Sequence, residues 1–218
     1  MAWVLRFYGS TIGKKIVMAV TGVILVGFVL GHVTGNLLVY RGPDALNAYA
    51  ALVKSSAVVL WGVRLTLLAA VGLHILSAVQ LTRLARAARP AGYDTLRSRA
   101  DTFSAHTMRW GGVALVIFLV YHILHFTTGT VHPSFDVHDV YGNVIWGFQV
   151  PWVAGFYIVA MVALGLHLHH GIWSLFQTLG VNHPHVNTGR KRIAAVVALL
   201  VSAGFIAIPV GVLAGVLK

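Results

Sequence analysis

Residues 16–40, IVMAVTGVILVGFVLGHVTGNLLVY, decide the fold class of this chain. The stretch holds no charged residue, and it is long enough to cross a bilayer core, which takes about 20 mainly apolar residues. Further stretches of the same character follow it. The complete set of expected spans is 16–40, 57–81, 110–130, 150–179 and 193–217. The sequence therefore predicts an all-α integral membrane protein, a bundle of five transmembrane helices forming one domain over residues 1–218.

The composition supports a membrane protein as well. Hydrophobic residues make up 58% of the chain and charged residues only 10%, against about 25% charged residues in ordinary soluble domains. A soluble protein with so few charges would have too little polar surface to cover its core. The net charge of +11 comes from short basic clusters between apolar runs, so we expect lipid and not nucleic acid as the partner of these charges.

The position of these basic clusters predicts the orientation. With a cytoplasmic N-terminus, the clusters within residues 6–15, 83–109 and 190–192 all lie inside, whereas the connection 131–149 has no Lys or Arg. The positive-inside rule therefore favours a cytoplasmic N-terminus and a C-terminus on the outer side.

Two connections have a character of their own. Residues 42–57 are too polar to cross the bilayer, and Pro43 at their start favours a short helix along the outer interface. Residues 89–101 contain Pro and Gly and are expected to form an inner loop.

The absence of cysteine narrows the possible cofactors. Thiolate-bound zinc, iron–sulfur clusters, covalently attached haem and disulfides all require cysteine, and the chain has none but has twelve histidines. Ionisable residues inside spans are rare and mark functional sites by default. The histidines within spans are therefore the candidate ligands.

An internal repeat selects four of them. GVILVGFVLGH (22–32) aligns without gaps with GVALVIFLVYH (112–122), and AVGLHI around His74 aligns with ALGLHL around His167 at nearly the same spacing. Counted along the helices, His32 and His122 lie at an outer level, and His74 and His167 lie at an inner level. Two imidazoles facing each other at one level suit a six-coordinate haem iron. The alternative is that each histidine only hydrogen-bonds to a neighbouring helix.

Further candidates lie close to these positions. His125 and His170 are one turn beyond His122 and His167 and are reserve candidates for the same roles. Arg64 is a candidate partner for the propionates of an outer haem, and Arg109 or Lys15 for those of an inner haem, although headgroup contact explains the last two equally well. His106 precedes the third span, where it meets a quinone head group or water.

The motifs also resemble a known family. They are GKKIVMAVTGVILVGFVLGHVTGN (13–36), GLHILSAVQLTR (72–83), TMRWGGVALVIFLVYHILHF (107–126) and FYIVAMVALGLHLHHGIWS (156–174). In this order, over nearly the whole chain, they resemble the cytochrome b membrane-anchor subunit of succinate:quinone oxidoreductases (succinate dehydrogenase/fumarate reductase), of the single-subunit, five-helix, di-haem type.

The resemblance implies one axial haem ligand on each of the first four spans: His32, His74, His122 and His167. The family pattern His-x-x-x-Gly-x-aromatic fits His167, Gly171 and Trp173, which favours His167 over His170.

It also implies a role in electron transport in the cell (inner or plasma) membrane. The implied cofactors are two haems b and a quinone, menaquinone by likeness to single-anchor bacterial members. Succinate chemistry, a step of the tricarboxylic acid cycle, would belong to separate flavoprotein and iron–sulfur subunits, so no catalytic residue is expected here. Succinate oxidation and fumarate reduction are both compatible with the sequence, since direction depends on potentials and partner subunits.

Two alternatives differ in function. A di-haem subunit of hydrogenase, formate dehydrogenase or nitrate reductase would share the histidine pairs. A haem-free, histidine-lined transporter would call for broken spans or midplane carboxylates. The chain has no Glu, and its Asp residues all lie outside the expected spans.

Overall fold

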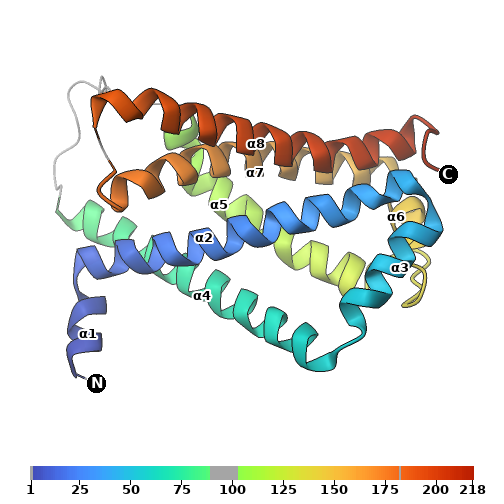
Figure 1. Cartoon of the computed structure of the whole chain (residues 1–218), viewed down its shortest axis with the longest axis horizontal. Coiled ribbons are helices and arrows are strands. Elements are labelled where there is room, and N and C mark those ends of the chain that lie inside the picture. Colours follow the sequence, from blue (N-terminus) through green and yellow to red (C-terminus); the bar gives the residue numbers. More distant parts are fainter. Residues whose placement is uncertain (1, 89–102, 182) are drawn as a thin grey trace.

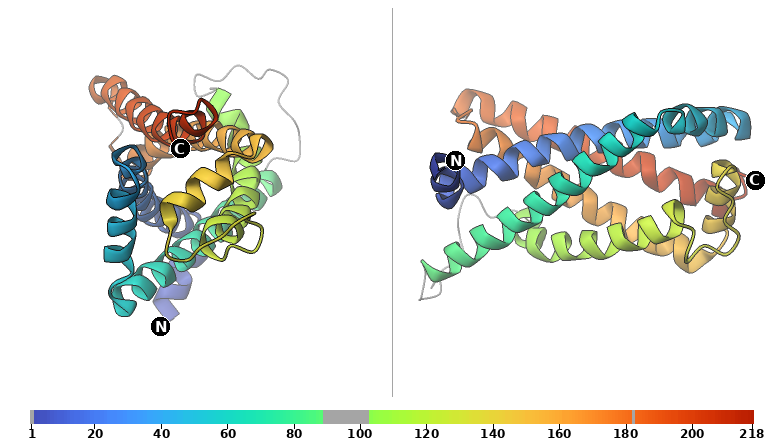
Figure 2. Two further views of the ribbon diagram at one scale, coloured as in Figure 1. Left: turned by 90° about the vertical axis from the view of Figure 1, so that its right-hand side faces the viewer. Right: turned by 90° about the horizontal axis from the view of Figure 1, so that it is seen from below.

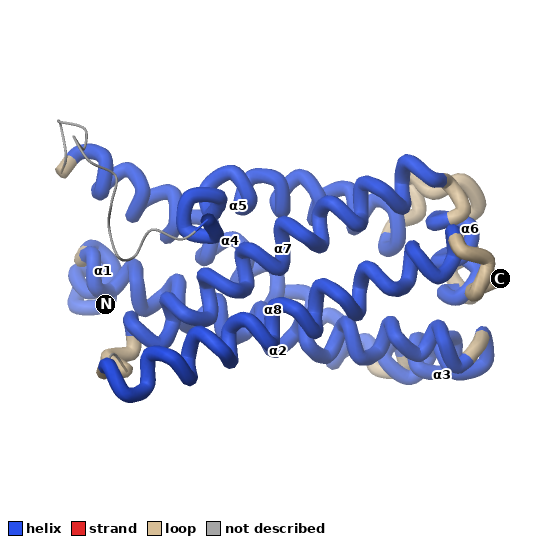
Figure 3. The backbone as a smooth tube through the Cα atoms, turned by 90° about the horizontal axis from the view of Figure 1, so that it is seen from above, coloured by secondary structure: helices blue, strands red, loops and turns tan. Residues whose placement is uncertain are grey.

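The computed structural model describes residues 2–88, 103–181 and 183–218. Within this part of the chain the secondary structure is helical, with no strand (Figure 1, Figure 3). Five helices are long and apolar enough to cross a membrane. The predicted fold class is therefore confirmed. The loop expected at 89–101 lies outside the described residues.

The helices follow the expected spans closely. Their bounds are α1 (Ala2–Gly9), α2 (Thr11–Asn36) with a 3-10 turn η1 (Leu37–Arg41), α3 (Pro43–Lys54), α4 (Ala57–Ala87), α5 (Phe103–His122) with a π-helical turn η2 (Ile123–Thr127), α6 (Val140–Phe148), α7 (Pro151–Thr178) and α8 (Pro184–Leu213). The expected interfacial helix is α3, with Pro43 at its start. Several spans extend past the apolar run into polar turns, most clearly α8, which begins at Pro184 after the His183 cap.

The helices pack as two groups, α5 with α7 and α8, and α2 with α4, which are joined by contacts of α2 with α7 and α8. α7 runs along α8 and α5 along α7, while α4 packs against α2, and α2 also contacts α7 and α8 (Figure 1, Figure 2). In the most apolar 18-residue stretch of each span, only 6% of the residues of α4 and of α5 are buried, against 33% in α7 and 28% in α8. α4 and α5 are therefore the peripheral helices, and their apolar outer faces suit a lipid solvent.

The N- and C-termini lie at opposite ends of the bundle, as an odd number of spans requires (Figure 1). At the N-terminal end, the Ser10 hydroxyl accepts a hydrogen bond from the Gly13 amide and caps α2. Lys14 is buried, and its Nζ donates to the carbonyls of Tyr8 (2.9 Å) and Gly9 (2.7 Å). Lys14 thus holds the turn between α1 and α2.

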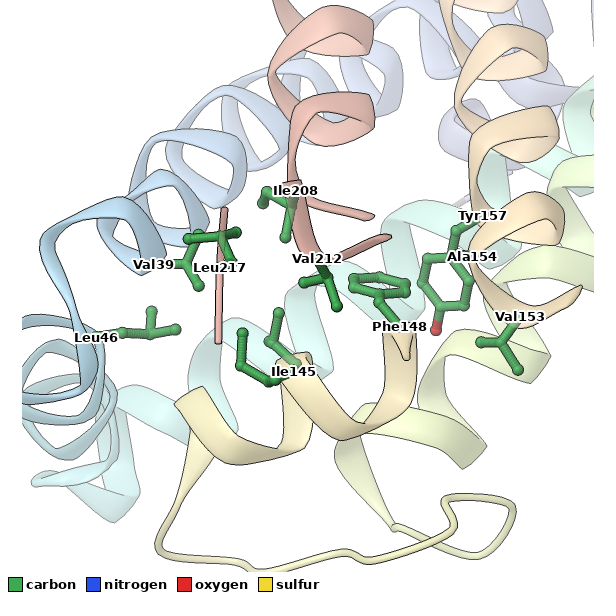
Figure 4. Packing of buried hydrophobic residues seen from close by; sticks show 11 residues of the cluster. Val39, Leu46, Ile145, Phe148, Val153, Ala154, Tyr157, Ile208, Val212 and Leu217 are labelled. Carbon is green, nitrogen blue, oxygen red and sulfur yellow. The ribbon is translucent and has the colours of Figure 1, made fainter. Parts of the chain in front are cut away.

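The opposite end is closed by a cap made of α3, the connection 128–139 and α6. The Asp139 carboxylate accepts hydrogen bonds from the Gly142 amide (2.9 Å) and from Asn47 Nδ2 on α3 (3.0 Å), which joins the two short helices. Val144, Ile145 and Phe148 of α6 are buried, and they pack with residues of η1, α3, α7 and α8 (Figure 4). From the sequence we expected only a connection over 131–149, so α6 was missed.

Candidate functional site

Four helices bring the predicted histidines together in two pairs. The ring centres of His32 on α2 and His122 on α5 are 5.9 Å apart, and those of His74 on α4 and His167 on α7 are 6.3 Å apart. Metal–imidazole bonds of about 2 Å place two imidazoles on opposite sides of one metal ion with ring centres about 6 Å apart. Both separations therefore fit two ligands of one iron. That these residues bind haem remains a prediction.

Three of the four rings have a polar neighbour at Nδ1. His74 Nδ1 lies 3.1 Å from the Thr21 hydroxyl, His122 Nδ1 lies 3.4 Å from the Tyr157 hydroxyl, and His32 Nδ1 lies 3.3 Å from Asn36 Nδ2. The fourth ring differs, because the buried Nδ1 of His167 has no hydrogen-bond partner among the described residues. Metal-bound histidines commonly hold a second group at the ring nitrogen away from the metal. For His74 and His122 the partner at Nδ1 is a hydroxyl oxygen that can accept the N–H, which leaves Nε2 for a ligand. For His32 the partner is an amide nitrogen, which only donates, so this contact does not by itself leave Nε2 of His32 free.

Two open apolar grooves lie on the bundle surface. One of about 280 Å³ is lined by α5 and α7 and includes His167, and one of about 340 Å³ between α2 and α4 includes Phe28, whose ring stacks on His32 at 5.2 Å. A Cβ atom added at Gly27, Gly31 or Gly111 would meet nothing within 4 Å. Apolar grooves suit a hydrophobic group better than a polar substrate.

The donor set fits haem better than a bare metal ion. The described residues contain no group of three or more His, Asp or Glu side chains that could hold a metal by themselves. Two opposed imidazoles are a sufficient protein contribution when a macrocycle supplies the four in-plane nitrogens. The residues present thus fit haem, and they do not form a protein-only metal site.

The structure separates His125 from His122. His125 is completely buried, its ring stacks on His132 at 4.8 Å, and its Nδ1 lies 3.1 Å from the Tyr157 hydroxyl. In a regular α-helix, side chains three residues apart are neighbours, but η2 is a π-helical turn in which each residue rotates less about the axis. The turn carries His125 toward the cap while His122 faces His32.

Other histidines are placed by local contacts. The His170 ring lies against Trp173, with ring centres 6.2 Å apart, while His167 faces His74. His132 is half-buried, and its Nε2 lies 2.8 Å from the Asn143 carbonyl oxygen. The side chain of His106 lies outside the described residues.

The basic candidates occupy three different settings. Arg64 is half-buried, with its guanidinium over the Trp61 ring at 5.2 Å. Lys15 and Arg109 are exposed, which is the setting that headgroup contact requires. The roles of all three toward haem propionates remain predictions.

Sequence reasoning missed the polar partners of the histidines. Asn36 follows His32 by one helical turn, so its contact was accessible from helical spacing. Thr21 and Tyr157 act from neighbouring helices, and no pattern within one helix marks such contacts.

Comparison with known proteins identifies the family. Residues 85–207, more than half of the chain, match the family model described as the succinate dehydrogenase/fumarate reductase transmembrane subunit. The chain belongs to this family. This transmembrane subunit is therefore a multi-pass membrane protein that associates with the other subunits of succinate dehydrogenase or fumarate reductase. Neither the curated proteins nor the solved structures contain a match to it.

Proposed function

We propose that this transmembrane subunit is of the single-chain, di-haem type and holds two haems b. His32 and His122 would ligate one, and His74 and His167 the other. The observation that carries the proposal is the pair of ring separations, 5.9 Å and 6.3 Å, formed between four different helices.

The protein's contribution is to hold and space these ligands. Bound haem supplies a one-electron couple, and imidazole on both faces leaves its iron without an open position for oxygen. The stretch of α2 from Thr21, which contacts His74, to His32 is about 16 Å long at about 1.5 Å per residue. The two pairs therefore lie at two depths, as a path for electrons across the bilayer requires.

In the assembled complex, electrons would pass between the iron–sulfur subunit and membrane quinone through this chain. We place the N-terminal end in the cytoplasm, where the partner subunits would dock, and the cap on the outer side, as the basic clusters favour. Menaquinone is the proposed quinone. Since the chain has no Glu, protons exchanged with quinone would use histidine, hydroxyl groups or water.

The test is a redox difference spectrum of the purified complex with its haem content per chain. We expect b-type bands, two haems per chain and reduction by succinate. His32→Ala or His122→Ala should each remove the same haem, and His74→Ala or His167→Ala the other. His138→Ala, which alters an exposed connection residue, is the control and should retain both.

Several outcomes would refute the proposal. A colourless, folded complex would favour the haem-free transporter. Haems that succinate does not reduce would favour a different respiratory complex, although family membership already favours the succinate-linked one. Retention of both haems in His167→Ala would transfer the role to His170.

A further inference from the structure

We infer that Thr21 is a positioning residue for the His74–His167 pair: it fixes the tautomer of His74 and sets the redox potential of one haem only. The inference rests on the proposed function, since it concerns a haem ligand. Thr21 itself would touch neither iron nor macrocycle, because it acts through His74.

The contact joins two helices at a tightly packed point. Thr21 on α2 is 5% exposed, and its Oγ1 lies 3.1 Å from Nδ1 of His74 on α4. A Cβ atom added at the adjacent Gly22 would lie 3.6 Å from Cε1 of His74. The His74 ring therefore lies directly against the α2 backbone, where the Thr21 hydroxyl and the Met18 carbonyl are its polar neighbours.

The Thr21 hydroxyl has hydrogen-bond acceptors for its proton within its own helix. Thr21 Oγ1 lies 2.8 Å from the Val17 carbonyl oxygen and 3.1 Å from that of Met18, the usual intrahelical partners of a threonine. A hydroxyl has a single proton, and carbonyl oxygens accept only. Oγ1 therefore presents lone pairs to His74.

This arrangement decides the tautomer of His74. A neutral imidazole carries one N–H, and the contact with an acceptor assigns it to Nδ1. Nε2 is then left with a free lone pair, as a metal ligand needs. Thr21, with the Met18 carbonyl beside it, thus favours the tautomer that can bind a metal.

The same hydrogen bond has an electronic effect. Donation from Nδ1–H makes the imidazole a more basic ligand, and a more basic ligand favours ferric over ferrous iron. Within this pair the effect falls on His74, because Nδ1 of His167 is buried without a hydrogen-bond partner in the part of the chain that the structure describes. In the other pair, the Tyr157 hydroxyl is 3.4 Å from His122 Nδ1. Thr21 should therefore lower the midpoint potential of one haem and leave the other unaffected.

The test compares Thr21→Val and Thr21→Ser in the purified complex, by redox titration of the haem bands and by electron paramagnetic resonance of the ferric haems. Thr21→Val removes the hydroxyl with little change of shape. We expect the midpoint potential of one haem to rise, with changed resonance positions for that haem alone. Thr21→Ser keeps the hydroxyl and should match the unmodified protein.

Thr34→Val is the matched control. Thr34 is also on α2, and its hydroxyl donates to the Leu30 carbonyl (2.8 Å), but the side chain is exposed and lies away from His74. This variant loses the same type of intrahelical hydrogen bond and should change neither potential.

The outcomes separate the two proposals. An unmodified complex without haem refutes the proposed function. Two haems in the unmodified complex, with no rise in either potential in Thr21→Val, refute the inference about Thr21 alone. The inference also fails if both haems shift equally or are both lost, if Thr21→Ser behaves like Thr21→Val, or if Thr34→Val gives the same shift. Loss of a single haem in Thr21→Val, with both retained in Thr21→Ser, supports it.

Discussion

Replacing Gly147 with alanine should loosen the cap, because this glycine lets α6 pack onto a histidine ring. A Cβ atom at position 147 would lie 2.9 Å from Cε1 and 3.2 Å from Nε2 of His125, and 3.1 Å from Nε2 of His132. All three separations are shorter than ordinary carbon contacts of about 3.5–4.0 Å. The His125 ring has little room to retreat, since it is completely buried between Tyr121, Phe126 and His132.

The magnitude follows from two opposing effects. Inserting a methyl group into a packed site costs about 1–3 kcal/mol, while replacing a helical glycine by alanine gains up to about 1 kcal/mol. Gly155→Ala in α7 isolates the second effect, because a Cβ atom there meets nothing within 4 Å. The free energy of unfolding of Gly147→Ala should therefore be about 1–3 kcal/mol lower than that of Gly155→Ala. In a chain of this size, a loss of about 1 kcal/mol in the free energy of unfolding lowers Tm by about 2–4 °C. The apparent Tm of Gly147→Ala should therefore be several degrees lower than that of Gly155→Ala.

The assay is thermal unfolding of the detergent-solubilised complex, with circular dichroism as the readout and the two variants measured side by side. Equal apparent Tm values for Gly147→Ala and Gly155→Ala would refute the packing of α6 on His125.

Three further changes test other parts of the structure. Gly111→Leu should fill the groove beside His167 and lower the haem content toward one per chain, measured as the haem-to-protein ratio. An unchanged haem content would show that haem does not occupy this groove. Asp139→Ala removes the N-cap of α6 and the hydrogen bond to Asn47, and should lower the free energy of unfolding by about 0.5–2 kcal/mol. The apparent Tm should fall and proteolysis of α3 and α6 should become faster, with partial recovery in Asp139→Asn. Lys14→Met should speed hydrogen exchange in α1, because it removes two hydrogen bonds from a charged donor to carbonyl oxygens, each of which stabilises the fold by about 1.5–3 kcal/mol. Exchange as slow as in the unmodified protein would show that Lys14 does not hold the turn between α1 and α2.

The spans were predictable because the bilayer imposes a length on each of them. An apolar run of about 20 residues has few alternatives to a transmembrane helix, so the expected stretch 57–81 corresponds to α4. The placement of His32 opposite His122 was accessible for a related reason. The repeat carries depth information, because two aligned segments running in the same direction place equivalent residues at equivalent levels.

Features that depend on contacts between helices were not predictable. α6 has only nine residues, too few to span a bilayer, and it becomes helical where its apolar side meets η1, α7 and α8. The Thr21–His74 contact joins residues 53 positions apart. Helical periodicity describes one helix at a time, so neither feature leaves a periodic signal in the sequence.

His122 and His125 show how local geometry resolves an ambiguity that spacing leaves open. In a regular α-helix the two rings would share a face, and either would be able to approach His32. The hydrogen bond from the Thr128 amide to the Ile123 carbonyl is the i to i+5 bond of a π-turn, and it rotates His125 away from that face. The cap then holds the rotated ring, because Gly147 leaves space for it and the Tyr157 hydroxyl meets its Nδ1. Tyr157 contacts His122 as well, so one side chain holds both the histidine that faces the cap and the histidine that faces the candidate haem site. Loosening the cap should therefore disturb the geometry of the His32–His122 pair before that of the His74–His167 pair.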